Sequence, residues 1–184
     1  MSESKTPPPS LLTAAQIQAS AEIGLGHILN PGGSAIYMRT LSRATGMARA
    51  HVNLGRLPPG KQAFVYHSHL ATEEWLYILS GRGRTEIDGR THEVGAGDFM
   101  GFPAPSVAHV MWNPYEEDLV YLMGGEDMSR DIGVFPRHGK YMVTLAEKSF
   151  LVDAAATRPV TLEEFLLPGS PAAEPQESGA PKAP

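Results

Sequence analysis

The chain has 184 residues, of which 42% are hydrophobic, which is enough for one domain with a core plus extensions. Its net charge of −5, without clustered lysines and arginines, argues against nucleic acid or an anionic membrane surface as a partner, so we expect a small-molecule ligand. Because there is no cysteine, any bound metal would need nitrogen and oxygen ligands. No secretion signal and no long apolar run occur, which predicts a cytoplasmic protein.

Both ends of the chain are predicted to be disordered. Residues 1–10 are polar and proline-rich, which is typical of an unfolded lead. From Gly169 the sequence consists of proline, alanine, glycine and serine with scattered charges, so it has too little apolar surface to fold. We therefore expect a single domain over residues 11–167, followed by a disordered tail over residues 168–184.

The first ordered elements are predicted to be a helix and two strands. A short helix is expected within Leu11–Gly24, with Thr13 as its N-cap. The turn Asn30–Gly33 precedes strands predicted over residues 34–42 and 48–57. These strands would extend the sheet formed by the rest of the domain.

The stretch Gly60–Gly81 carries the clearest chemical pattern. Alternate side chains of a strand share a face, so His67 and His69 would point the same way and could bind one cation. A second strand is predicted to start at Glu74, and an antiparallel return would bring its carboxylate beside the two imidazoles. Glu73 would face the opposite side. A fourth ligand must come from elsewhere in the chain.

The second informative stretch, Gly97–Asn113, contains the predicted fourth ligand, His109. Together the two stretches resemble the paired motifs of the cupin superfamily, in particular small bacterial single-barrel proteins of the cupin 2 type. The sequence departs from the family pattern in three places. There is one extra residue between Gly60 and His67, Pro105 stands where the family has glycine, and three residues rather than two follow it before His109. The residues that fill the two patterns are Gly60, His67, His69, Glu74, Gly81, Gly97, Pro103, His109 and Asn113.

This resemblance covers Val52 to about Met123 (residues 52–123) and implies an all-β fold, a jelly-roll barrel. The turn signals agree with it, because Asp88-Gly89 is a strong two-residue hairpin signal and short strands follow at regular spacing. The strands expected in this part cover residues 85–87, 91–94, 98–102, 107–112 and 118–123. Later elements are predicted to be edge strands over Asp131–Phe135 and Lys140–Thr144, and a helical turn that Thr161 caps.

The strand that starts at Glu74 is predicted to have two different faces. Leu76 and Ile78 would fill the barrel, while the opposite face would form an exposed apolar patch of Trp75, Tyr77 and Leu79. Such a patch usually marks a covered surface. The cover would be either residues 34–57 of the same chain or the partner in a homodimer, an assembly that is common in cupins.

Three imidazoles and one carboxylate suit one divalent transition metal: iron, manganese, nickel, copper or zinc. On an octahedral ion they would leave two positions for a substrate or dioxygen. The pocket around the metal is predicted to be apolar. Its expected lining is Val65, Leu76, Ile78, Val107 and Met111, with Phe99 and Phe102 closing one side.

The pattern therefore predicts a metal-dependent enzyme for a small organic substrate, with a dioxygenase slightly favoured over an isomerase or lyase. The alternative is a non-catalytic module that binds or senses a small molecule. A proton-transferring residue near the metal would favour an enzyme, and His51, Glu86 and Tyr121 are the candidates. Solvated or hydrogen-bonded roles are expected for His27, His51, His92 and His138, of which His51 has the best chance of facing the pocket.

Overall fold

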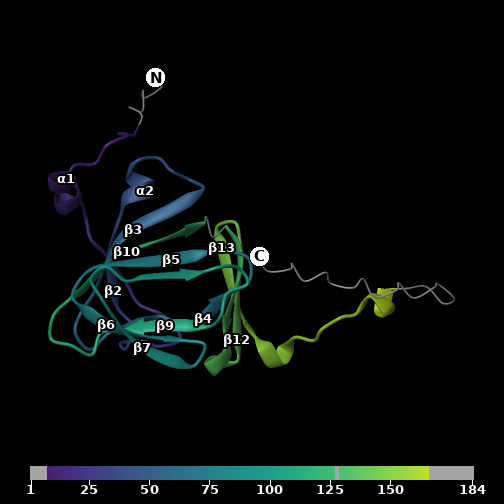
Figure 1. Cartoon of the computed structure of the whole chain (residues 1–184). Helices are drawn as coiled ribbons and strands as arrows, with labels where there is room; N and C mark the ends of the chain where they lie inside the picture. Colours follow the sequence, from purple (N-terminus) through teal and green to yellow (C-terminus); the bar gives the residue numbers. More distant parts are fainter. Residues whose placement is uncertain (1–7, 127–128, 166–184) are drawn as a thin grey trace, which may run out of the picture. The chain divides into compact units, whose positions relative to one another are not determined.

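The computed structural model describes residues 8–126 and 129–165 (Figure 1). Most of the predicted lead and all of the predicted tail over residues 168–184 lie outside the described residues. The chain divides into two compact units, Met1–Ala154 and Ala155–Pro184. The first unit contains the strands, and in the second unit the described residues include the 3₁₀ turn η3 (Leu162–Phe165), where Thr161 precedes the turn as predicted.

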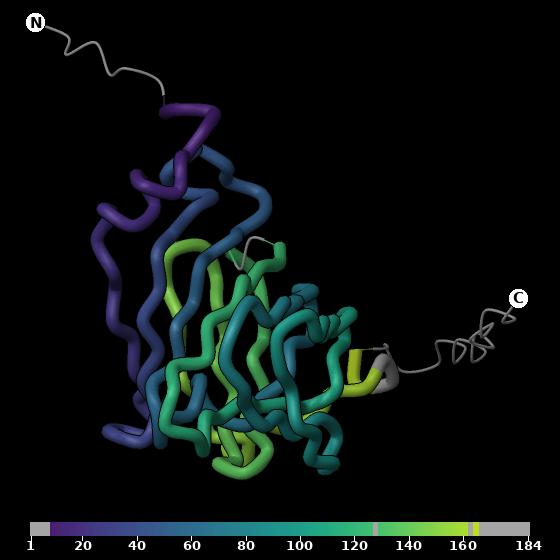
Figure 2. The backbone as a smooth tube through the Cα atoms, turned by 60° about the vertical axis from the view of Figure 1, so that its left-hand side comes forward, coloured from purple at the N-terminus to yellow at the C-terminus, as the bar shows by residue number. Residues whose placement is uncertain are grey.

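Two antiparallel sheets form the first unit, and the all-β jelly-roll prediction is confirmed. In strand order, the first sheet contains β1 (Ile23–Leu25), β2 (Ile36–Thr40), β3 (Ala50–Leu57), β10 (Leu119–Glu126), β5 (Glu74–Ser80) and β8 (Phe99–Phe102). The second contains β13 (Lys148–Asp153), β12 (Lys140–Leu145), β11 (Arg130–Phe135), β4 (Gln62–His69), β9 (His109–Trp112), β6 (Arg82–Ile87) and β7 (Arg90–Gly95). Figure 2 shows β1, β2 and β3, purple to blue, side by side along one edge.

The predicted N-terminal helix is present as α1 (Ala14–Ala19). Thr13 is its N-cap: the Thr13 Oγ1 accepts from the Gln16 backbone at 3.3 Å, and the Gln16 side chain accepts from the Thr13 backbone at 2.8 Å. This reciprocal pair satisfies two amides that a helix start leaves unpaired. A second helix that was not predicted, α2 (Leu41–Ala44), follows β2 directly, so the strand predicted over residues 34–42 ends early.

The Asp88-Gly89 hairpin prediction is confirmed. Asp88 has φ +50° and Gly89 has φ +74°, the left-handed values that a two-residue hairpin of this kind requires at both positions. The turn joins β6 to β7, with Ile87 paired with Arg90.

Two topological predictions are wrong, and one of the two alternatives for the apolar patch is excluded. His67 and Glu74 lie on β4 and β5, which belong to different sheets and do not pair as a hairpin. Neither predicted edge strand is at an edge, because β11 lies between β12 and β4 and β12 lies between β13 and β11. The edge is β13, which was not predicted. The strands within residues 34–57 extend the sheet as predicted, because β3 pairs with β10 and β2. They therefore do not cover the apolar patch, which was one of the two alternatives for its cover.

The space between the sheets is filled by apolar side chains from both. Leu76 and Ile78 are buried as predicted, while Tyr77 and Leu79 on the other face of β5 are 40% and 43% exposed. Within the described ranges, the helices are too short and too polar to span a membrane.

Candidate metal centre

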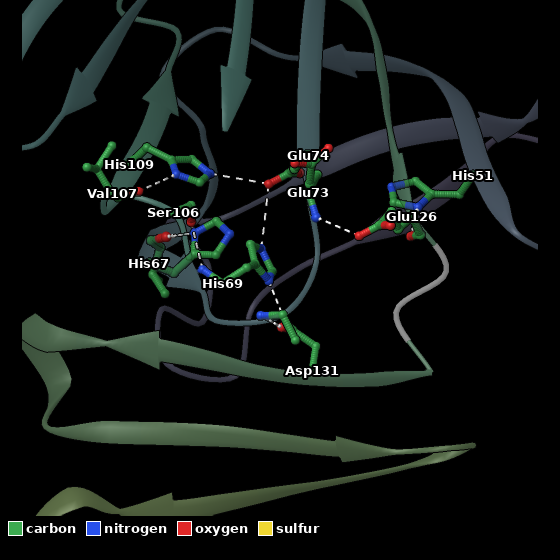
Figure 3. Close-up of polar contacts among 12 residues, drawn as sticks. His51, His67, His69, Glu73, Glu74, Ser106, Val107, His109, Glu126 and Asp131 are labelled. Carbon is green, nitrogen blue, oxygen red and sulfur yellow. Dashed lines mark hydrogen bonds and ion pairs between the residues drawn. The ribbon is translucent and has the colours of Figure 1, made fainter. Parts of the chain in front are cut away.

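His67 and His69 come from the end of β4, and both side chains are buried on its inner face, as the alternation predicted. His109 begins β9, which pairs with β4, and the register sets His109 opposite His67. Glu74 begins β5 in the other sheet. Figure 3 shows its carboxylate directed across the barrel toward His109 and His69.

The Glu74 carboxylate is the centre of the cluster. Its Oε2 lies 3.2 Å from His109 Nε2 and 3.6 Å from His69 Nε2. His67, His69 and Glu74 can hold a metal ion, because their ligand atoms all lie within 4.8 Å of one another. The imidazole of His109 is 4.7 Å from that of His67, measured between ring centroids, but His109 lies outside the group of three.

Hydrogen bonds fix the tautomers of His67 and His109. Their Nδ1 atoms lie 2.7 Å from the Val65 carbonyl oxygen and 3.0 Å from the Val107 carbonyl oxygen. A carbonyl oxygen can only accept, so Nδ1 carries the proton in each ring. In His67 Nε2 then keeps a lone pair, which is the form that binds a metal. His109 Nε2 instead contacts the Glu74 carboxylate and must lose a proton before it can bind one.

Asp131 does the same for His69. Its Oδ2 lies 2.5 Å from His69 Nδ1, and its Oδ1 accepts from the Ala71 backbone at 3.1 Å. A buried carboxylate on Nδ1 orients the ring and increases the basicity of Nε2. Asp131 was placed on a predicted strand but not assigned to the site. It is 62 residues away from His69, and no local pattern indicates that β11 pairs beside the end of β4.

The cluster shifts the pKa values of its members. Burial disfavours the charged Glu74 carboxylate, but hydrogen bonds from His109 and His69 outweigh burial and hold its pKa well below the usual range. Burial, with the neighbouring His109, lowers the pKa of His67 to about 4. For His69, burial is outweighed by the hydrogen bonds to Glu74 and Asp131, which raise its pKa. The site therefore favours an ionised Glu74 carboxylate and a neutral His67 imidazole.

The predicted apolar lining is partly correct. Phe102 stacks on the His109 imidazole with ring centroids 3.6 Å apart, and Leu76 and Met111 line a narrow cavity with the ligands. Phe99 is 63% exposed, because it lies three residues before Phe102 on β8 and therefore points to the opposite face. Val107 is also exposed, so both were wrongly placed in the pocket.

A pocket of about 300 Å³ opens beside the cluster, and His51 forms part of its wall. In the sheet register His51 of β3 faces Gly125 of β10, and Gly125 faces Glu74. A Cβ at Gly125 would lie 2.3 Å from the Glu73 carbonyl oxygen and 3.0 Å from the His51 ring. The absence of a side chain at Gly125 therefore leaves room for the His51 ring at the register position across from Glu74. Glu126 lies beside this ring (Figure 3).

Two imidazoles in this wall have opposite tautomers. His51 Nδ1 lies 2.8 Å from the Glu126 carbonyl oxygen, so Nδ1 donates and Nε2 is an acceptor. His27 Nδ1 instead accepts from the Leu29 backbone at 3.2 Å, so in the neutral ring Nε2 carries the proton. Burial, with the nearby His138, lowers the pKa of His27 and favours that neutral ring. No sequence pattern had placed His27 here, because it lies in the irregular segment before the barrel.

The other two candidate proton-transfer residues are placed less well. Glu86 lines a different pocket, where its carboxylate pairs with Arg137 at 2.5 Å. Tyr121 is almost completely buried, and burial raises its pKa further above the usual value.

Phe64 has an unusual backbone in the middle of β4. Its φ is +58°, and the register between β4 and β9 shifts between Ala63 and His67. Bulky residues rarely adopt this conformation. The irregularity places the Phe64 ring in the pocket wall beside His67, at 6.2 Å between ring centroids, although Phe64 alternates with the inward-facing residues.

Comparison with known proteins places these features in a family. The family model for a cupin domain matches residues 53–125, which include all four predicted ligands. A protein of known structure from Acidithiobacillus ferrooxidans, designated a candidate sugar phosphate isomerase, is 32% identical, with a TM-score of 0.79 over 82% of this chain and 96% of that chain. Among curated proteins there is no match.

Two further structures are similar in fold. A sugar phosphate isomerase of the cupin superfamily from Silicibacter pomeroyi is 21% identical, with a TM-score of 0.70 over 79% of this chain and 95% of that one. A predicted oxalate decarboxylase from Thermotoga maritima is 23% identical, with a TM-score of 0.51 over 60% and 95%. At these identities the likeness concerns the fold alone. The domain match and the A. ferrooxidans relative, aligned along nearly its whole length, show that the chain belongs to the cupin superfamily.

Proposed function

We propose that the protein is a metal-dependent isomerase that moves a proton between adjacent carbons of a small hydroxycarbonyl compound of the sugar type. One observation carries the proposal: two imidazoles of opposite tautomer line the pocket that also contains the ligand cluster. An isomerisation of this kind needs a group that removes a proton and a group that donates one.

The chain would hold one divalent metal through Nε2 of His67, His69 and His109 and through the carboxylate of Glu74. The donor set fits, because the acceptors on Nδ1 direct the three Nε2 atoms into the cluster and Glu74 is ionised. The Nε2 protons through which His69 and His109 contact Glu74 would be lost when the metal binds. Iron, manganese, nickel, copper and zinc all accept such ligands. A bound divalent metal would supply Lewis acidity that polarises a substrate carbonyl.

His51 is the proposed general base. Its Nδ1–H is held by the Glu126 carbonyl, so Nε2 can take the proton from the carbon that bears the hydroxyl group. The same nitrogen would return the proton to the adjacent carbon. His27 would give its Nε2 proton to the carbonyl oxygen as the enediol forms, and would take a proton back from the neighbouring hydroxyl oxygen as that oxygen becomes the new carbonyl. The substrate and product have the same formula, so the reaction needs no external oxidant or reductant.

The A. ferrooxidans relative supports this reaction over oxidation, since it is designated a candidate sugar phosphate isomerase. Oxidation by dioxygen, which the sequence slightly favoured, uses the same ligand set but gives no role to a pair of proton-transferring groups. The two reactions therefore differ in what they need from His51.

The experiment is hydrogen–deuterium exchange followed by NMR. Protein loaded with each metal in turn is incubated in D₂O with a panel of aldoses, ketoses and their phosphates, and solvent deuterium should enter at the carbon next to the carbonyl. His51→Gln should reduce exchange by roughly 10²- to 10⁴-fold without changing the metal content. His92→Gln, which removes an exposed histidine on β7, is the matched control.

Other results would contradict the proposal. Oxygen uptake by the iron-loaded protein with no deuterium exchange would favour the oxidative reading. Binding of chelating compounds without any turnover would favour a non-catalytic binding module.

A further inference from the structure

A second pocket, of about 510 Å³, adjoins the pocket at the ligand cluster. The two pockets share three wall residues, His51, Phe64 and Met123. The second pocket extends toward α2 and the start of β3. A molecule bound at the metal therefore has a second, separate space beside it.

Asn53 is the buried polar group of this second pocket. It lies on the inner face of β3, opposite Thr40 of β2 and Met123 of β10, and it is 8% exposed. Its side-chain amide has no hydrogen-bond partner among the described residues. In these residues every fully buried side-chain nitrogen or oxygen has a partner, so the Asn53 amide is not fully buried. The amide must therefore reach the space of the pocket. Its nearest walls include Leu25 and Met123, and an unpaired amide in such surroundings is unfavourable without a ligand.

Arg43 supplies a positive charge at the same pocket. Its guanidinium forms no ion pair with the described residues, and the pocket has no aspartate or glutamate in its lining. Two other arginines nearby differ in this respect, because Arg39 and Arg56 both pair with Glu22. The net charge of the chain is −5, but this pocket has an arginine and no acidic residue, so its charge favours binding of an anion.

We propose that the second pocket binds the phosphate group of the substrate, with Arg43 as the cation and with Asn53 and Thr40 as neutral hydrogen-bond donors. This inference rests on the proposed function, since the other end of the same molecule would bind the metal. Arginine pairs well with phosphate because its guanidinium offers parallel N–H donors. The Thr40 hydroxyl is available as well, because it makes no capping hydrogen bond to α2.

The test compares two chelating hydroxy acids that differ by one phosphate, glycerate and 3-phosphoglycerate. Binding to manganese-loaded protein is measured by calorimetry, and binding of inorganic phosphate to metal-free protein is measured by ³¹P NMR. The wild-type protein should bind 3-phosphoglycerate roughly tenfold or more tightly than glycerate. Arg43→Gln and Asn53→Ala should each remove most of that preference and leave glycerate binding unchanged. Arg49→Gln, an exposed arginine outside the pocket lining, should keep the preference.

The two proposals fail in different ways. Equal binding of both acids, or a preference that survives Arg43→Gln, would overturn the phosphate site but leave the metal chelation intact. If glycerate did not bind, the proposed function would be in question. The ³¹P measurement would then still decide the phosphate site, because phosphate signals that are equally sharp with wild-type and Arg43→Gln protein would overturn it.

Discussion

The ligand cluster and the wall of the pocket of about 300 Å³ beside it both contain histidines, but the histidine rings are held differently. In the cluster every Nδ1 faces an acceptor, so the Nε2 atoms of His67, His69 and His109 all point into the cluster, where a cation would bind. In the wall, Nδ1 of His51 faces an acceptor and Nδ1 of His27 faces a donor. His51 therefore has the tautomer of the cluster histidines, and its place outside the ligand cluster separates it from them. Only His27 presents Nε2–H to the pocket.

The largest expected effect is on the cluster itself. His67→Ala, His69→Ala, Glu74→Ala and His109→Ala should each reduce metal affinity by roughly 100-fold or more, because each removes a donor from a set with few replacements. Elemental analysis of purified variants measures this, with His51→Ala as the control that should keep its metal. Full occupancy in the His109→Ala protein would mean that His109 only hydrogen-bonds to Glu74.

Asp131 tests whether the contact at Nδ1 matters as much as the ligand. Asp131→Ala leaves His69 Nδ1 without its acceptor and should weaken metal binding by roughly 10- to 100-fold. Asp131→Asn keeps an acceptor oxygen and should have a smaller effect. Competition with a chromophoric chelator gives both affinities, and Asp153→Ala on β13 is the surface control. Unchanged affinity in Asp131→Ala would show that the ring of His69 is fixed by packing alone.

A smaller effect is expected from pH on the metal-free protein. The pKa of His67 falls from 6.5 to about 4 on folding, so between these values the unfolded chain binds more protons. The contribution of His67 to stability is therefore present above pH 6.5 and is lost as pH falls toward 4. Urea unfolding across this range should show a shallower pH dependence in His67→Gln than in the wild-type protein, and His92→Gln should match the wild type. Identical slopes in all three proteins would contradict the shift.

The smallest effect on the site should come from the predicted apolar patch, of which Tyr77 and Leu79 are exposed and Trp75 is half-buried. The homodimer remains a prediction, and its motivation is stronger because residues 34–57 do not cover this face. Sedimentation should give a dimer that Tyr77→Glu weakens, while metal content stays constant. Phe150→Glu, at another exposed aromatic on β13, should leave the dimer intact. A monomeric wild-type protein at micromolar concentration would contradict the prediction.

Sequence reasoning found what is local and missed what only the fold brings together. His67 and His69 could be predicted because strand alternation fixes the faces of neighbouring residues. Glu74 and His109 were predicted from the resemblance to the cupin motifs. Asp131, Asn53 and His27 could not, because each reaches its site through pairing between distant strands or through an irregular segment. The error at Phe99 had another cause, since alternation applied to β8 from Phe102 would have placed it outside.

Phe64 lies between the two pockets and contributes to the wall of each. A left-handed conformation at a bulky residue costs about 1 to 2 kcal/mol, which glycine would avoid, so the fold keeps an aromatic ring at this position despite the backbone strain. That ring belongs to the walls of both pockets. Any molecule that occupied both pockets would have to extend past this ring, so the Phe64 ring would select ligands by their length. Replacing Phe64 with glycine would relax the backbone and remove the ring between the pockets. Selectivity between short and long ligands would then fall even where binding at the cluster was unchanged.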